Sequence, residues 1–176
     1  MIVVSDTGPL ISLMKAGQLE LLQKLYQEIL IPEAVYQELT SNRRYENETA
    51  VIQGCDYIRT VPVRDRRVVE LLQKLSGLDL GESEAIAYAG EHKADILLME
   101  EAAGRRVAKS LGIHVRGSLG ILLLGFDRKL LTAEEVEQAT ARMRSANRRI
   151  SGQLYQYVLD YIRKPVESSY GLPLPE

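Results

Sequence analysis

Apolar residues along this chain recur in short blocks whose spacing alternates between that of strands and that of helices. Residues 2–5, 28–31 and 94–100 are largely apolar runs of strand length, bounded by polar or turn-forming residues. Between them, apolar positions fall three or four residues apart, as at Val35 and Leu39, which is the spacing of one helix face. Strands that alternate with helices in this way build a parallel sheet covered by helices. The pattern therefore predicts an α/β fold.

The predicted elements follow one another along most of the chain. Strands are expected at residues 2–5, 28–31, 57–61, 94–100 and 113–115. Helices are expected at residues 11–25, 32–41, 68–75, 82–93, 102–111, 118–126, 133–148 and 152–163, with a polar loop at 41–48. Two glycine-containing segments, residues 8–9 and 77–81, are interpreted as turns before helices. Thr132 and Glu135 fit a capping box, which predicts that a helix begins just after Thr132.

Length and composition indicate one main domain with a short appendage. The chain has 176 residues, 45% hydrophobic and 26% charged, which suits a folded core with an ordinary soluble surface. We expect the main domain at residues 1–130, a helical appendage at 131–164 and a loose tail at 165–176. The longest apolar run, residues 121–126, is much shorter than the roughly 20 residues of a membrane helix, and no signal-like segment opens the chain. The expected location is the cytoplasm, with no membrane segment.

The cysteine, histidine and charge content excludes several kinds of site. Cys55 is the only cysteine, so neither an internal disulfide nor a thiolate zinc site is expected. His92 and His114 are too few and too far apart for a histidine cluster, so any metal would be held by oxygen. The net charge of −2 excludes a uniformly basic nucleic-acid binder. Local arginines could still guide RNA or could be solvated helix faces; they are Arg105, Arg106, Arg142, Arg144, Arg148 and Arg149.

Four acidic residues stand where the predicted fold could bring them together. Asp6 and Glu100 each follow a strand, and the carboxyl ends of parallel strands form the edge where open α/β sheets bind ligands. Glu38 lies near the end of one predicted helix and Glu82 at the start of another. Glu38 could also be an ordinary solvated residue, and Glu82 could simply favour a helix N-terminus. Asp6 is harder to explain without a function, because an acid that ends a buried strand is costly.

Helical spacing separates Glu82 from its neighbour Glu84. Positions 82, 85, 86 and 89 share one face with the apolar core residues. Glu84 groups with Tyr88 and Glu91 on what we interpret as the solvent side. The spacing therefore favours Glu82 as the site residue.

Several motifs of the chain resemble the PIN domain family. They are DTGPLI at residues 6–11, PEAVYQE at 32–38, GESEAIAYA at 81–89 and ILLMEE at 96–101. The later motif GRRVAKSLGIHVRGSLGIL, residues 104–122, resembles one branch that is similar to VapC-type toxins. The resemblance covers residues 1 to about 125 and implies a three-layer α/β/α fold with four to five parallel strands, followed by C-terminal helices.

The resemblance implies a ribonuclease that cleaves RNA with Mg²⁺ or Mn²⁺, acting as the toxin of a toxin–antitoxin pair. It assigns catalytic roles to Asp6, Glu38, Glu82 and Glu100, and metal ligation to Asp6, Glu82, Glu100 and Glu101. Ser5 and Thr7 could support Asp6 or a bound water, or could be turn residues only. Arg105 could meet a phosphate or pair with the acids. An antitoxin partner and a homodimer are expected, the latter because the apolar face of residues 152–163 needs a cover.

Clustered carboxylates give a chemical reason for metal. They repel one another and raise each other's pKa unless a divalent cation neutralises them, and hard oxygen ligands suit Mg²⁺ or Mn²⁺. This branch usually has aspartate where the chain has Glu100 and Glu101. The longer side chains predict weak activity that is better with Mn²⁺, or a non-catalytic RNA-binding or protein-binding module. The motif DTG also occurs in aspartic proteases, but those enzymes are nearly all β, unlike this βα pattern.

Overall fold

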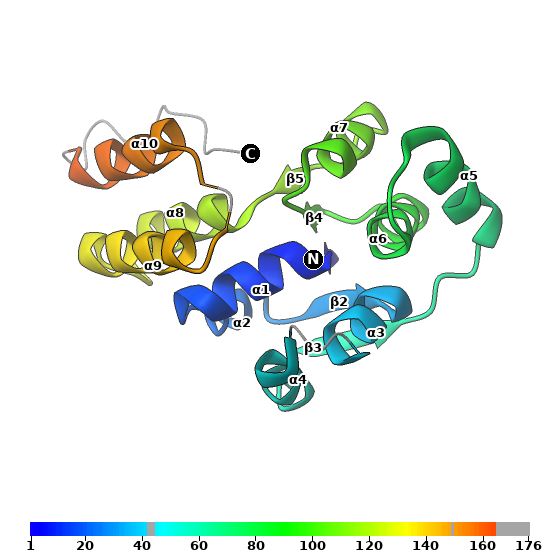
Figure 1. Ribbon diagram of the computed structural model, residues 1–176, viewed down its shortest axis with the longest axis horizontal. Helices are drawn as coiled ribbons and strands as arrows, with labels where there is room; N and C mark the ends of the chain where they lie inside the picture. Colours follow the sequence, from blue (N-terminus) through cyan, green and yellow to red (C-terminus); the bar gives the residue numbers. More distant parts are fainter. Residues whose placement is uncertain (42–44, 149, 165–176) are drawn as a thin grey trace.

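The computed structural model describes residues 1–41, 45–148 and 150–164, and its centre is a parallel sheet (Figure 1). The strands are β1 (Val3–Ser5), β2 (Ile29–Pro32), β3 (Ile58–Val61), β4 (Ile96–Leu98) and β5 (Val115–Arg116). Their order is β3-β2-β1-β4-β5, with every pair parallel. The chain builds outward from β1 to β3 and then returns to the other side of β1 for β4 and β5. This reversal puts the topological switch point beside β1. The parallel sheet itself confirms the predicted α/β fold class.

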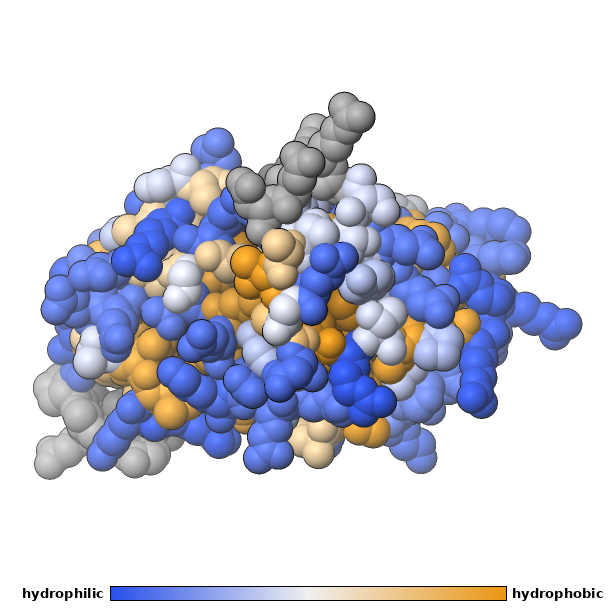
Figure 2. Space-filling view, turned by 90° about the horizontal axis from the view of Figure 1, so that it is seen from below, coloured by the Kyte–Doolittle hydropathy of each residue, from blue (hydrophilic) through white to orange (hydrophobic). Residues whose placement is uncertain are grey.

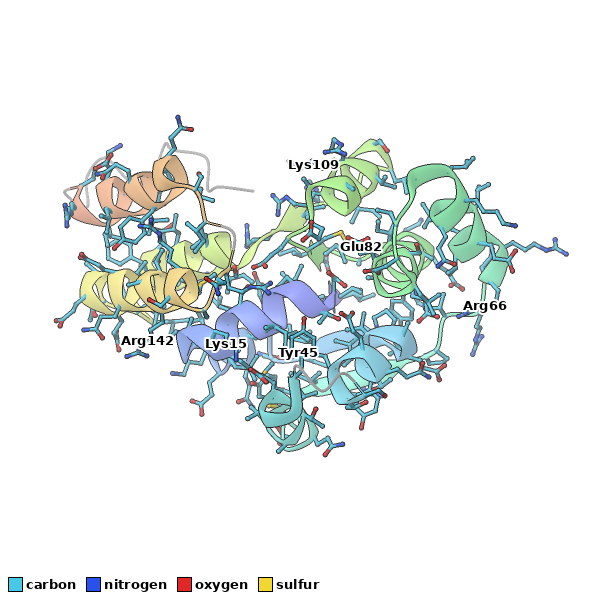
Figure 3. All side chains as sticks on the ribbon, in the orientation of Figure 1. Lys15, Tyr45, Arg66, Glu82, Lys109 and Arg142 are labelled. Carbon is cyan, nitrogen blue, oxygen red and sulfur yellow. The ribbon has the colours of Figure 1, made fainter. Side chains whose placement is uncertain are left out.

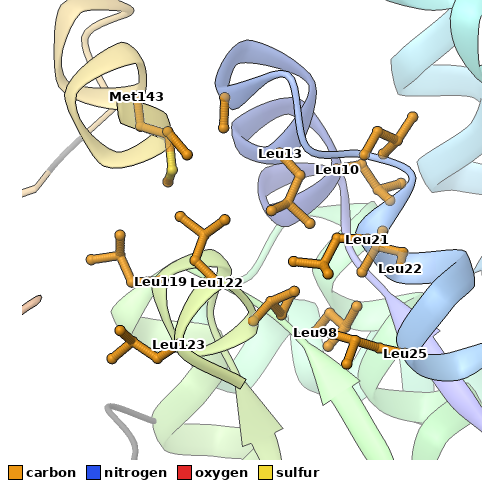
Figure 4. Packing of buried hydrophobic residues seen from close by; sticks show 14 of the residues in the cluster. Leu10, Leu13, Leu21, Leu22, Leu25, Leu98, Leu119, Leu122, Leu123 and Met143 are labelled. Atoms are coloured by element: carbon orange, nitrogen blue, oxygen red, sulfur yellow. The ribbon is translucent and has the colours of Figure 1, made fainter. Parts of the chain in front are cut away.

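Helices cover both faces of the sheet. They are α1 (Thr7–Ala16), α2 (Leu21–Tyr26), α3 (Glu33–Ser41), α4 (Glu46–Gln53), α5 (Arg66–Ser76), α6 (Leu80–Glu91), α7 (Ala102–Ser110), α8 (Ser118–Asp127), α9 (Ala133–Ser145) and α10 (Gly152–Arg163). Successive strand residues point to opposite faces, so Val3 and Leu98 join one buried cluster, whereas Val4 and Leu97 join the other. Figure 4 shows the first cluster, in which α1, α2 and α8 pack over the sheet.

Three local predictions were wrong. Residues 8–9 lie in the first turn of α1 rather than in a turn before it, because that turn tolerates proline, whose missing N–H would have no helical partner there. Gly81 likewise lies inside α6, where an added Cβ would be 3.5 Å from Val35 Cγ2 of the neighbouring α3. The expected loop at 41–48 runs into a helix, α4, although residues 42–44 of that loop lie outside the described part.

The two C-terminal helices pack on the rest of the chain. The capping box of Thr132 and Glu135 is confirmed at the start of α9, which lies along α1. Helix α10 packs on α8 and α9, and its Tyr161 hydroxyl donates to Asp127 Oδ2 at 2.8 Å. Part of the apolar face of α10 is therefore covered within the chain, with Val158 and Tyr161 buried. The expected tail at 165–176 lies outside the described residues.

Figure 2 shows one face of the molecule. On this face, hydrophobic side chains gather near the centre between charged borders. Of the helices in the described ranges, none has both the length and the apolar character to cross a membrane.

Candidate functional site

Asp6 follows the central strand β1 at the carboxyl edge of the sheet. Its backbone N–H donates to Leu98 O of β4 at 3.0 Å, and the residue occupies the N-cap position of α1 without a side-chain capping bond. Only 5% of Asp6 is exposed. The fold thus holds this carboxylate, buried, at the switch point between β1 and β4, where ligands bind in open α/β sheets.

Burial raises the pKa of Asp6 from 3.8 to about 7, although a hydrogen bond from the backbone of Thr7 acts in the opposite direction. Negative charges add to the rise, and they come from Asp79, Glu82 and Glu38. Such a pKa means that the charged form of Asp6 is costly in the metal-free chain, and a nearby cation would reverse the effect.

Glu38 reaches the site from α3. Its Oε2 accepts a hydrogen bond from Thr7 Oγ1 at 2.7 Å, so the residue after Asp6 orients this second acid. An added Cβ at Gly81 would be 3.6 Å from Glu38 Oε2 and 3.5 Å from Asp79 Oδ1. The glycine therefore leaves space around two carboxylates that reach the same place from different helices.

Glu82 and Asp79 are held together at the start of α6 by a capping box. Glu82 N donates to Asp79 Oδ1 at 2.8 Å, and Asp79 N donates to Glu82 Oε2 at 3.1 Å. Burial raises the pKa of Glu82, the backbone of Asp79 lowers it, and the charges of Asp79, Glu101 and Glu38 raise it further. Asp79 was not predicted as a site residue, because the spacing D-x-x-E at residues 79–82 is also the ordinary capping pattern of a helix N-terminus.

Glu101 approaches this group from the N-cap position of α7. Helix α7 can lie close to the end of β4 because Gly104 has no side chain. An added Cβ there would overlap Met99 Sδ. The same Cβ would be 3.5 Å from Glu82 Oε1, which places Glu82 between α6 and α7. Figure 3 shows Glu82 toward the middle of the molecule.

Glu100 is turned to a different set of partners. Its Oε2 accepts from Ser12 Oγ at 2.9 Å and from Arg148 Nη2 at 2.7 Å, and its Oε1 accepts from Ser118 Oγ. The fold therefore gathers Asp6, Glu38, Asp79 and Glu82, with Glu101 close to Glu82. It ties the carboxylate of Glu100 to a serine–arginine network instead.

The remaining candidates have backbone or packing partners. Ser5 Oγ donates to the carbonyl of Asp6 at 2.8 Å, and Arg105 Nη1 donates to Met99 O at 2.8 Å. Arg142 Nη1 donates to Ala16 O at 3.3 Å, while Arg144 lies 4.5 Å over the ring of Tyr155. Arg149 lies outside the described residues. The C-terminal arginines within the described part thus join helices to one another, which differs from a purely solvated face.

The prediction that Glu84 faces solvent was wrong. Glu84 is only 2% exposed, its Oε2 accepts from Ala34 N at 2.9 Å, and its Oε1 pairs with Arg66. The helical pattern missed this because the start of α3 packs over that side of α6. Glu84 therefore fixes α3 and the start of α5 against α6.

The acids around Asp6 suit a hard divalent cation in their chemistry. All are carboxylates, and both Asp6 and Glu82 have raised pKa values that such a cation would relieve. Within the described ranges, however, no three acidic, histidine or cysteine side chains converge closely enough to enclose an ion. The donor types are still those that a hard divalent cation prefers.

The chain matches a protein family over residues 2–164, and the family is described as DUF3368: PIN domain. No curated protein and no solved structure matches the chain. The family match extends through α10, beyond the motifs that carry the resemblance in the sequence.

Proposed function

The chain belongs to the PIN domain family, and on this premise we propose that it is a divalent-metal-dependent ribonuclease that hydrolyses RNA phosphodiester bonds. PIN domains are generally nucleases that use divalent metal ions. The observation that most supports the proposal is Asp6, a buried acid at the switch point whose pKa is raised to about 7 beside three other acids. Such an arrangement is unfavourable for folding and is typical of active sites.

In this proposal, Asp6, Glu38, Asp79 and Glu82 would hold the ion, with Glu101 at the rim. When bound, a divalent ion supplies a water of lowered pKa and stabilises the charge on the leaving oxygen. The protein side of the chemistry is positioning. Thr7 orients Glu38, and the capping box restricts Glu82, so two of the carboxylates start from fixed places. Asp6 can hold a proton near neutral pH only in the metal-free chain, because a bound cation would favour its ionised form.

The toxin role and an antitoxin are further proposals that rest on the family resemblance, and a homodimer is a further proposal that was based on the apolar face of α10. The partly covered face of α10 weakens that reason for a dimer. Helix α5 presents more exposed apolar side chains, among them Leu71 at 55% and Leu75 at 77%, which a second chain could cover.

Cleavage of a defined single-stranded RNA by the purified full chain tests the proposed function. Activity should require Mg²⁺ or Mn²⁺ and should disappear with chelator. The alternative is a non-catalytic module that binds RNA or protein. A chain that binds neither ion by calorimetry and cleaves no RNA would support that module.

Glu82→Gln should reduce cleavage more than Glu84→Gln, whereas Glu84→Gln should cost more stability. Glu84→Gln weakens charged hydrogen bonds of a buried side chain, so the free energy of unfolding of this variant should fall by about 1.5–3 kcal/mol. Glu82 lies beside Asp6, so its replacement should affect cleavage per folded molecule. Denaturant unfolding and initial cleavage rates measure the two effects, with the exposed Glu70→Gln as control. The reverse ranking in cleavage would move the site to Glu84.

Cleavage should be faster with Mn²⁺ than with Mg²⁺. Mg²⁺ demands near-octahedral geometry, which flexible glutamates meet poorly, while Mn²⁺ binds such sites more tightly. We expect Glu101→Asp to improve the Mg²⁺ rate more than Glu100→Asp, because Glu100 is already engaged by Arg148. Rates of both variants with each metal measure this. A larger gain in Glu100→Asp would make Glu100, rather than Glu101, a ligand of the ion.

A further inference from the structure

Arg148 connects the segment after α9 to the carboxyl edge of the sheet. Its Nη2 donates to Gly8 O at 3.0 Å and to Glu100 Oε2 at 2.7 Å, and its Nε donates to Ser12 Oγ at 2.7 Å. Ser12 in turn donates to the same Glu100 oxygen. One guanidinium thus joins the first turns of α1 to Glu100, the second residue after β4.

This network uses both oxygens of Glu100. Ser118, at the start of α8, donates to Oε1, while Ser12 and Arg148 donate to Oε2. The ion pair is partly exposed to solvent, because the side chains of Arg148 and Glu100 are 24% and 23% exposed. A cation could recruit Glu100 only by displacing these donors.

The backbone, by contrast, places Glu100 next to the acidic group. Ser5 pairs with Leu98 in the sheet, so Asp6 and Glu100 leave neighbouring strands at the same edge. An added Cβ at Gly8, two residues after Asp6, would be 3.4 Å from Glu100 Cβ. The side chain of Glu100 therefore starts beside Gly8, two residues from Asp6, and ends on Arg148.

We propose that Arg148 is a positioning residue that latches Glu100 away from Asp6 and its neighbouring acids, and thereby weakens binding of a divalent cation at that group. The proposal rests on the proposed metal-dependent function. A carboxylate paired with a guanidinium has less negative charge and fewer free lone pairs to offer a metal. Loss of Arg148 removes the only cation that binds Glu100 in this network and leaves each of its oxygens with one serine hydroxyl, which permits rotation of the carboxylate toward the cluster.

Calorimetric titration with Mn²⁺ alone tests the latch without relying on catalysis. We expect Arg148→Ala to bind Mn²⁺ about tenfold more tightly than the wild-type chain, which is a common size for coupling between contacting residues. Arg142→Ala is the matched control, because it removes one arginine of the same region that bonds Ala16 O and does not bond Glu100. It should bind Mn²⁺ like the wild type.

A double-mutant cycle distinguishes the latch from a general effect of charge. In the Glu100→Gln background, Arg148→Ala should give no gain in Mn²⁺ affinity, because no carboxylate is left to release. A gain that persists in this background would overturn the latch. So would unchanged or weaker binding in Arg148→Ala.

Two further variants separate failure of the latch from failure of the proposed function. If Asp6→Asn lowers Mn²⁺ affinity but Arg148→Ala does not raise it, only the latch fails; if no variant binds Mn²⁺, both fail. Arg148→Met keeps the length of the side chain and replaces Arg148→Ala if the latter does not unfold cooperatively. Loss of folding in both Arg148 variants would overturn the latch, because it would make the network a structural tie.

Discussion

Asp6→Asn is expected to reduce metal-dependent RNA cleavage by roughly 100-fold or more while the fold is kept, a loss of the size seen when an acid–base group is removed. Asparagine has the same shape but no charge, so it would neither balance a divalent cation nor take up a proton. The fold should be kept, because burial of the charged carboxylate is unfavourable in the metal-free chain. Initial rates on a labelled RNA at saturating Mn²⁺ measure the effect.

Asp95→Asn is the matched control for this experiment. Asp95 lies just before β4 at the opposite edge of the sheet, where its Oδ2 accepts from Ile2 N at 2.6 Å. The same chemical change there should leave the cleavage rate near that of the wild type. Undiminished cleavage by Asp6→Asn would remove this carboxylate from the mechanism.

The metal-free chain is expected to lose stability as the pH rises toward neutral, relative to Asp6→Asn. The pKa of Asp6 is about 7 in the folded chain against 3.8 as its ordinary value. The folded state therefore holds this proton more tightly than the unfolded state. The stabilisation is full below the unfolded pKa, declines above it and is lost as the pH passes the folded pKa.

The raised pKa of Glu82 acts in the same direction. The free energies of unfolding of wild type and Asp6→Asn should change relative to each other by on the order of 4 kcal/mol between the unfolded and the folded pKa of Asp6. Denaturant unfolding in chelator, at intervals from about pH 5 to about pH 8, measures most of it. Saturating Mn²⁺ should flatten the wild-type curve, since a bound cation lowers the pKa of nearby carboxylates.

The Asp95→Asn variant should follow the wild-type pH dependence, because its carboxylate is at the far edge of the sheet. Parallel curves for wild type and Asp6→Asn would contradict the raised pKa. A wild-type curve that Mn²⁺ leaves unchanged would count against metal binding beside Asp6, whatever the cleavage assays show.

Much of the fold follows from local patterns in the sequence. The strand sequence, the capped start of α9 and the span of α10 were predictable, because apolar periodicity and capping act within a few residues. The position of Asp6 was predictable too, since it follows a predicted strand of a parallel sheet and so lies at the carboxyl edge. Residues 8–9, Gly81 and the start of α4 were exceptions, because each was predicted as turn or loop and lies in a helix.

What the sequence determined by itself is which acids stand at strand and helix ends, and hence which could meet at the carboxyl edge of the sheet. Only the tertiary structure decided where their side chains go. Glu84 is buried because the start of α3 packs on it from 50 residues away, and Glu100 is held by Arg148 from 48 residues away. Helical periodicity reports the face of one helix and contains no information about a neighbour that arrives from a distant segment. The partners of a buried carboxylate are therefore fixed by packing between elements.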